Sequence, residues 1–266
     1  MKSMKLYDRV HRIHNELAAR GIKPDAPLTV AQLTPFDQYN YFGPAAVDEA
    51  IEVLDIKPGM RVLDIGSGIG GPARYIAEKT GAHVTALELQ SDLSELAGDL
   101  TRRCGLSHLV EHRTGNVLDG IDGEYDAVLS MLCFLHIPDR SRLFEICRNA
   151  MTPGAVLYIE DYGRHREATA EEAMALAAKV QCPFVPSIDE YRHHLADAGF
   201  GHVELDDVTQ QWTAFTATRL AAYRDNRGRN IAVHGVDVVN GLDDFYATVE
   251  GLFSGGLIAG LRITAS

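Results

Sequence analysis

The chain has 266 residues, of which 46% are hydrophobic, and a formal net charge of −12. That length favours one large domain, or one domain with an added cap, with ample apolar material for a core. A nucleic-acid partner is disfavoured, because such partners are bound chiefly through Lys and Arg, and the sequence has no dense basic run.

The four cysteines, Cys104, Cys133, Cys147 and Cys182, include no C-x-x-C pair, so the sequence predicts no metal site. No apolar run approaches the ~18 residues that a membrane helix needs. The N-terminus also lacks the apolar stretch of a signal peptide. We therefore expect a soluble, cytoplasmic protein with reduced thiols, which acts as a monomer or homodimer without a membrane partner.

The first 43 residues differ in pattern from the rest of the chain. Apolar residues at helical spacing predict a helix over residues 6–20, which Gly21 ends. Residues 22–43 contain three prolines and finish in the aromatic-rich PFDQYNYFG, and we expect them to be irregular. A second amphipathic helix begins at Pro44, where proline suits the first turn.

From Arg61 onward, apolar runs of strand length alternate with segments of helical periodicity. The first five runs are RVLDI (61–65), HVTALEL (83–89), VEHRTGNV (110–117), YDAVLSML (125–132) and AVLYIED (155–161). Helices are predicted over residues 71–81, 92–105 and 141–151. This alternation predicts an α/β domain with a parallel sheet and helices on both faces.

The last part of the chain adds more helices and two more strands. Helical stretches at 168–180 and 188–198 precede a sixth strand at 201–208, and a seventh strand is predicted at 256–265. Amphipathic segments between these two strands predict a helical cap insertion at about 209–254, placed at one end of the sheet.

The stretch LDIGSGIGG places four glycines between the first strand and the first helix of the sheet. The spacing Gly66-x-Gly68-x-x-Gly71 fits a dinucleotide-binding loop, because glycine lets the backbone turn tightly and approach a ligand. Asp64 would repel a pyrophosphate but would attract a cationic amine. Glu88, at the end of the second strand, can accept two ribose hydroxyls from either kind of cofactor. The residues alone therefore leave two cofactors open, a nicotinamide dinucleotide and a nucleoside that carries an amine.

The stretch VLDIGSGIGGPARYIAEKTGAHVTALEL resembles the first two motifs of the class I S-adenosylmethionine-dependent methyltransferases. The resemblance continues through GNVLDG, YDAVLSMLCFLHI, MTPGAVLYIED and the last two strands, and covers roughly residues 36–265. It implies a Rossmann-like seven-stranded sheet whose antiparallel last strand lies between the fifth and sixth. The chain is similar to small-molecule enzymes of this family, such as the sarcosine/dimethylglycine and phosphoethanolamine N-methyltransferases. It would then comprise an N-terminal helix and lid segment, 1–43, and a methyltransferase domain, 44–266, that carries the cap.

The resemblance implies S-adenosyl-L-methionine as cofactor and S-adenosyl-L-homocysteine as product. The glycine loop and Asp64 would hold the methionine part, Glu88 the ribose, and the residues around Gln90 and Asn116 the adenine. Asn116 stands where the family usually has an aspartate. The residues implied for the cofactor are Gln38, Tyr41, Asp64, Gly66, Ser67, Gly68, Gly70, Glu88, Leu89, Gln90, Asn116, Val117, Ser130 and Met131.

The acceptor is less constrained by the sequence. The stretch SMLCFLH has Leu132 and Cys133 where related N-methyltransferases often carry an acidic residue, which predicts a more apolar acceptor pocket. We expect the pocket to be lined by Tyr39, Leu132, Cys133, Phe134 and Trp212, and one of the cap arginines, Arg219, Arg224 or Arg227, could meet an acidic group on the acceptor. A thioether or a substituted amine needs no base, whereas a carbon or hydroxyl acceptor would need one, with His136 or Tyr162 as candidates. The methylated atom could thus be nitrogen, sulfur, carbon or oxygen.

Two alternatives stay open at this point. One is an NAD(P)-dependent oxidoreductase, which Asp64 and the lack of a paired Tyr/Lys motif disfavour. The other is a non-catalytic nucleoside-binding protein of the same fold, which the intact glycine loop, Asp64 and Glu88 disfavour.

Overall fold

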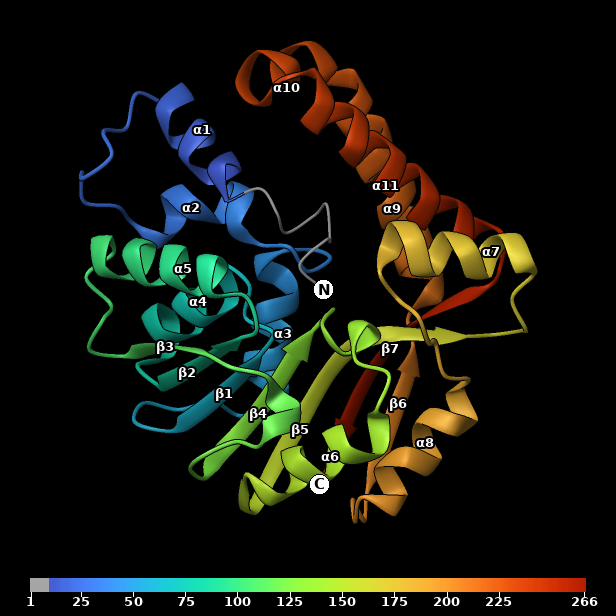
Figure 1. The fold of residues 1–266 in the computed structure, drawn as a ribbon. Coiled ribbons are helices and arrows are strands. Elements are labelled where there is room, and N and C mark those ends of the chain that lie inside the picture. The colour runs from blue at the N-terminus through green and yellow to red at the C-terminus, as the bar shows by residue number, and fades with distance from the viewer. Residues whose placement is uncertain (1–9) are drawn as a thin grey trace.

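A twisted seven-stranded sheet forms the centre of the computed structural model, which describes residues 10–266 (Figure 1). The strands are β1 (Arg61–Ile65), β2 (His83–Glu88), β3 (Val110–Thr114), β4 (Tyr125–Met131), β5 (Met151–Arg164), β6 (Val203–Asp207) and β7 (Ile258–Ala265). Their order is β3-β2-β1-β4-β5-β7-β6, and β7 pairs antiparallel with both of its neighbours. The Rossmann-like fold with an inserted antiparallel last strand is therefore confirmed.

Helices cover both faces of the sheet, as the near-continuous apolar strands require (Figure 1). The helices are α3 (Pro44–Val53), α4 (Gly71–Thr80), α5 (Ser91–Arg103), α6 (Arg140–Asn149) and α8 (Ile188–Asp197). Val47 of α3 and Ile76 of α4 are fully buried in the core on one face. Phe144 of α6 and Tyr191 of α8 are fully buried in the core on the other face. Among residues 10–266, none of the helices is both long enough and apolar enough to cross a membrane.

Three cap helices rise beyond the end of the sheet where β4 ends (Figure 1). They are α9 (Thr209–Asp225), α10 (Arg227–His234) and α11 (Val236–Ser254). They occupy the predicted insertion at 209–254, and the short α10 is a helix that the sequence did not predict. The predicted helix at 168–180 is α7 (Ala170–Ala175) followed by the π-helical turn η3 (Leu176–Val180).

The N-terminal segment contains α1 (His11–Ala19) and α2 (Val30–Asp37), which pack beside α4 and α5. The predicted start of the first helix, residues 6–9, lies outside the described residues. The prediction that residues 22–43 are irregular is confirmed for 22–29 and 38–43 and was wrong for Val30–Asp37, where Thr29 and Gln32 form a capping box that begins α2. Pro35 lies inside this short helix and does not prevent it.

The N-terminal segment and the cap are joined by polar contacts between α1 and α10, in addition to the packing of Tyr41 on Trp212. Both carboxylate oxygens of Glu16 in α1 accept hydrogen bonds of 2.6 Å from Arg229 in α10. His234 Nε2 lies 2.9 Å from the same carboxylate. The two segments therefore enclose the carboxyl ends of the strands from opposite sides.

Candidate active site

The loop between β1 and α4 adopts backbone conformations that favour glycine. Gly66, Gly68 and Gly70 have φ values of 77°, 54° and 73°. A Cβ atom on Gly66 would lie 2.1 Å from Sγ of Cys133. The backbone N–H of Gly68 donates a 2.9 Å hydrogen bond to Oε2 of Glu88, which ties the loop to the end of β2.

Three cavities meet around this loop. We call them the Glu88 cavity, the Asp64 cavity and the Arg219 cavity, and their volumes are about 150, 40 and 140 Å³. Gly66 borders the first two, Leu132 borders the second and third, and His136 borders the first and third. The three cavities are thus parts of one site.

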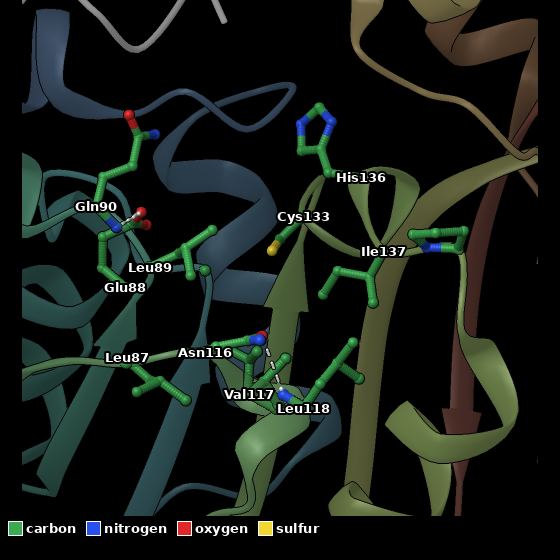
Figure 2. Close-up of a pocket in the computed structure, with 14 residues that line it drawn as sticks. Leu87, Glu88, Leu89, Gln90, Asn116, Val117, Leu118, Cys133, His136 and Ile137 are labelled. Atoms are coloured by element: carbon green, nitrogen blue, oxygen red, sulfur yellow. Dashed lines mark hydrogen bonds between the residues drawn. The ribbon is translucent and has the colours of Figure 1, made fainter. Parts of the chain in front are cut away.

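The Glu88 cavity is an apolar slot with a carboxylate at one side (Figure 2). It is lined by Ile65, Gly66, Leu87, Glu88, Leu89, Gln90, Gly115, Asn116, Val117, Leu118, Cys133, His136, Ile137 and Pro138. Oε1 of Glu88 accepts a 2.9 Å hydrogen bond from the N–H of Gln90, and burial raises the Glu88 pKa. Oδ1 of Asn116 accepts from the N–H of Leu118 at 3.1 Å. An aromatic base joined to a sugar suits this combination of apolar walls and carboxylate.

The Asp64 cavity contains buried polar atoms that have no hydrogen-bond partner among residues 10–266. They are Oδ2 of Asp64, Oγ of Ser67 and Oδ1 of Asn40. Burial and, to a lesser degree, the charge of Glu88 raise the pKa of Asp64 to about 7. Lys and Arg are absent from the described residues that line this cavity. A cationic amine would therefore gain a carboxylate partner here and would return the pKa of Asp64 towards its usual value.

A buried ion pair stands behind the Asp64 cavity. Oδ2 of Asp37, at the end of α2, lies 2.9 Å from Nη2 of Arg74 in α4, and both side chains are buried. A Cβ atom on Gly71 would lie 2.3 Å from the carbonyl oxygen of Asp37. Sequence reasoning missed this pair, because a single charge in each of two separate helices carries no signal of contact.

The Arg219 cavity lies between the lid segment, the end of the sheet and the cap. It is lined by Arg12, Gln38, Tyr39, Asn40, Tyr41, Leu132, Leu135, His136, Tyr162, Val180, Phe215, Arg219, Phe245 and Tyr246. The hydroxyl oxygens of Tyr41 and Tyr162 are 2.5 Å apart, and burial raises the pKa of both. Because both phenols keep their protons, Tyr162 is poorly suited to act as a base at neutral pH.

His136 is the better placed of the two candidate bases. Its Nδ1 lies 3.0 Å from the carbonyl oxygen of Gln181, and a carbonyl only accepts hydrogen bonds, so Nδ1 carries the proton. Burial lowers the pKa of the ring, which keeps it neutral near pH 7. The lone pair of the neutral ring is then on Nε2, and this nitrogen can take a proton.

The structure separates three residues that the sequence grouped in the acceptor pocket. Phe134 lies in the core, with its ring 5.9 Å from that of Phe144. Trp212 is fully buried and meets the ring of Tyr41 edge-on at 4.7 Å. Cys133 borders the Glu88 cavity instead of the Arg219 cavity.

Two residues implied for the cofactor support the site from behind. Oγ of Ser130 donates a 3.0 Å hydrogen bond to the carbonyl oxygen of Ile65, which joins β4 to β1. A Cβ atom on Gly70 would lie 2.6 Å from Cε1 of His112, away from the three cavities. The other implied cofactor residues border the Glu88 cavity, the Asp64 cavity or both, apart from Gln38 and Tyr41. These two border only the Arg219 cavity.

Comparison with known proteins gives one family and several relatives. A family model described as a methyltransferase domain matches residues 39–205. Phosphoethanolamine N-methyltransferase 1 of Zea mays is 31% identical over 205 residues, which are 75% of this chain and 40% of that relative. Glycine/sarcosine/dimethylglycine N-methyltransferase of Actinopolyspora halophila is 34% identical over 160 residues, 59% of this chain and 28% of the relative. The chain thus spans less than half the length of these curated relatives.

A solved structure of Haemonchus contortus phosphoethanolamine N-methyltransferase 2, bound to phosphomonomethylethanolamine and S-adenosylhomocysteine, has a similar fold. The TM-score is 0.78 at 21% sequence identity, and the match covers 86% of this chain and 54% of that one.

Proposed function

The chain belongs to the family of methyltransferase domains, and we propose that it moves the methyl group of S-adenosyl-L-methionine onto a small-molecule acceptor. The junction of the three cavities at Gly66, Leu132 and His136 carries this proposal. A nucleoside fits the Glu88 cavity, an amino-acid end fits the Asp64 cavity, and an acceptor fits the Arg219 cavity. The sulfonium would lie where the cavities meet.

The cofactor contacts follow from the donors and acceptors that border each cavity. Glu88 accepts from the ribose hydroxyls, and Leu89, Gln90, Asn116 and Val117 surround the adenine. Asp64 and Ser67 hold the amino-acid end, with Gly66, Gly68 and Met131 against the methionine chain. Tyr39, Tyr41 and Gln38 close over the sulfonium, because aromatic faces attract a cation. Gly70 and Ser130 fix the backbone behind these contacts.

The transfer itself is an in-line displacement at a carbon that the positive sulfur already activates. The enzyme mainly has to bring the acceptor to the methyl group in a water-excluded site. Leu132 and the rings of Tyr162 and Phe215 give the Arg219 cavity apolar walls. His136 takes the acceptor proton where there is one to lose. The acceptor atom remains nitrogen, sulfur, carbon or oxygen.

The relatives make an amine a natural first candidate for the acceptor. The printed names of the maize and Actinopolyspora relatives describe N-methylation of phosphoethanolamine, glycine, sarcosine and dimethylglycine. Screening amines, thioethers and hydroxylated metabolites for release of S-adenosylhomocysteine identifies the acceptor.

We propose the domain organisation, the partners and the cellular location from the composition and the sequence pattern. Residues 1–43 act as a lid and residues 44–266 as the catalytic domain, with the cap at 209–254. The net charge of −12 argues against a nucleic-acid partner. Four free cysteines fit a reducing cytoplasm, where we expect a monomer or homodimer.

Calorimetric titration with S-adenosylhomocysteine and with NAD tests the proposal. We expect the first to bind and the second not to, because Asp64 would repel a pyrophosphate. Tight NAD binding without S-adenosylhomocysteine binding would establish the oxidoreductase alternative. If a Gly66→Val, Asp64→Ala double variant kept its role in the cell, the non-catalytic alternative would hold.

A further inference from the structure

Arg219, at the wall of the acceptor site, is a cation that has no counterion among residues 10–266. Its Nε and Nη2 atoms are buried and have no hydrogen-bond partner among residues 10–266. No carboxylate in the described part of the chain forms an ion pair with it, whereas the buried Arg74 and Arg140 pair with Asp37 and Asp161 at 2.9 Å. A buried guanidinium without an anion costs free energy, so its donors are available for an anionic ligand.

Aromatic rings hold Arg219 in place. Its guanidinium carbon lies 4.8 Å from the ring centre of Tyr41, 5.5 Å from that of Phe215 and 4.5 Å from that of Tyr246. These rings restrict the side chain while leaving nitrogen atoms unpaired. An arginine preorganised in this way loses little conformational entropy when it binds a carboxylate or a phosphate.

The rest of the Arg219 cavity also favours an anionic ligand. Arg12 also borders it, with a buried Nε that has no hydrogen-bond partner in the described part of the chain. Asp and Glu are absent from the described residues that line it. A ligand whose only charge is positive would meet two cations and no carboxylate.

The position of Arg219 also defines how a ligand would be oriented within the Arg219 cavity. Arg219 and Tyr246 border a second, outer cavity of about 460 Å³ between α1 and the cap, which Arg20, Asn226 and Asn230 help to line. Leu132 and His136, by contrast, border the Arg219 cavity and the two cofactor cavities. The inner end of the Arg219 cavity therefore faces the cofactor, and its outer end leads to the 460 Å³ cavity.

Resting on the proposed function, we propose that the methyl acceptor is an anion whose carboxylate or phosphate binds Arg219 at the outer end of the cavity. Its reacting atom then points inward to Leu132 and His136. Substituents beyond the charged group extend into the outer cavity. A carboxylate and a phosphate share the chemistry that Arg219 recognises, and the experiment distinguishes them.

Ring-shaped probes of different charge test this assignment on the full chain saturated with S-adenosylhomocysteine. Benzoate, phenyl phosphate, benzamide and benzylamine are titrated calorimetrically. We expect at least one of the two anions to bind about 10- to 100-fold more tightly than neutral benzamide and cationic benzylamine, because charge-assisted hydrogen bonds are the stronger ones. The preferred anion shows whether the site takes a carboxylate or a phosphate.

Variants test whether Arg219 causes the preference for anionic probes. Arg219→Met should abolish it, Arg219→Lys should retain part of it, and Arg148→Met should leave it unchanged. Arg148 is the matched control because it also lies over a ring, that of Phe200 at 5.9 Å, but borders none of these cavities. Equal binding of all four probes, failure of both anions to bind, or an anion preference that survives in Arg219→Met would overturn the proposal.

Binding of S-adenosylhomocysteine separates this failure from that of the proposed function. A chain that binds S-adenosylhomocysteine but shows no anion preference refutes only the acceptor class. If the chain does not bind S-adenosylhomocysteine, the proposed methyltransferase function is refuted. Arg219→Met should keep its affinity for S-adenosylhomocysteine, because Arg219 does not border the Glu88 or Asp64 cavity.

Discussion

The two halves of the site are formed in different ways. The cofactor half consists mainly of residues at or just after the carboxyl ends of β1, β2, β3 and β4, and more than half of its lining comes from residues 64–69, 87–90 and 115–118. The acceptor half combines side chains from α1, the lid segment, β5 and the cap helices. A parallel sheet brings the first set together automatically, whereas the second depends on how these separate segments pack against one another.

This difference predicts how each half responds to substitution. In the cofactor half, the positive φ of Gly66 and Gly68 disfavours a side chain and Gly66 also leaves no space for one, so small changes should have large effects. In the acceptor half, contacts are made by large side chains in pairs and clusters, so single changes should have graded effects.

Gly66→Ala should have the largest effect on cofactor binding. The added Cβ combines a φ of 77° with a 2.1 Å approach to Sγ of Cys133. We expect the affinity for S-adenosylhomocysteine to fall about 100- to 1000-fold in calorimetry, from strain and overpacking together. Gly98→Ala is the control, because Gly98 lies in α5 with open space around its Cβ position and should tolerate alanine. Unchanged affinity in Gly66→Ala would show that the loop does not hold the cofactor.

His136→Gln should lower kcat about 100-fold for an acceptor that loses a proton, because an amide cannot take that proton. Burial lowers the His136 pKa, so the ring is neutral over the physiological range. The wild-type kcat should therefore be flat near neutrality and fall only at acid pH. An unchanged kcat in the variant would indicate an acceptor that needs no base, such as a thioether.

Asp64→Asn should weaken S-adenosylhomocysteine binding about 10-fold at pH 8, because the cationic amine loses its carboxylate. In the wild type, binding should also weaken as the pH falls below about 7, where Asp64 becomes protonated before the cofactor binds. The variant should lose this pH dependence. Titrations in buffers of different ionisation enthalpy measure the proton released on binding.

The same variant should unfold at a higher temperature than the wild type when no cofactor is present. The folded chain keeps a proton on Asp64 up to pH about 7, whereas the unfolded chain loses it near 3.8. Stability of the wild type therefore falls as the pH rises through this window, by about 4 kcal/mol in all. Asparagine cannot ionise, so the variant avoids this loss at pH 8. Asp55→Asn, which changes an exposed carboxylate, should alter neither stability nor affinity.

The sequence indicated which residues lie together in the proposed cofactor half much better than which lie together in the proposed acceptor half. Strand ends, glycines and the carboxylates Asp64 and Glu88 form a local pattern whose spacing defines its geometry in a parallel sheet. The structure brings these residues together around two joined cavities. Thr29 followed by Gln32 is the sequence pattern of the capping box that begins α2, but the prediction rested on the three nearby prolines and did not use it.

The acceptor half was harder because its contacts join residues far apart in the chain. The sequence could not distinguish Arg219 from the other cap arginines, since only packing shows which of them turns inward. Nor could it show that Phe134 belongs to the core, because one residue of difference around a 3₁₀ turn decides which way a ring points. Tyr41 and Tyr162, 121 residues apart, carried no signal of the hydrogen bond between them.

Tyr41→Phe and Tyr162→Phe should give the smallest effects, and together they probe the acceptor half as a unit. Each single change leaves the remaining hydroxyl buried without its 2.5 Å partner and should cost about 1–3 kcal/mol of unfolding free energy. The double variant should cost less than the sum of the two, because both polar groups are then removed. Denaturant unfolding of all four chains measures this coupling.

The Tyr41→Phe and Tyr162→Phe changes should affect methyl transfer less than they affect stability. The phenyl rings still border the cavity, so KM for the acceptor should rise only a few-fold while S-adenosylhomocysteine affinity stays unchanged. Strict additivity of the two changes in unfolding free energy would mean that the two hydroxyls do not interact in solution. The packing of the lid segment on β5 would then rest on the cluster of rings, whose centres lie 4.7–6.5 Å apart and which consists of Tyr41, Tyr162, Trp212 and Phe253.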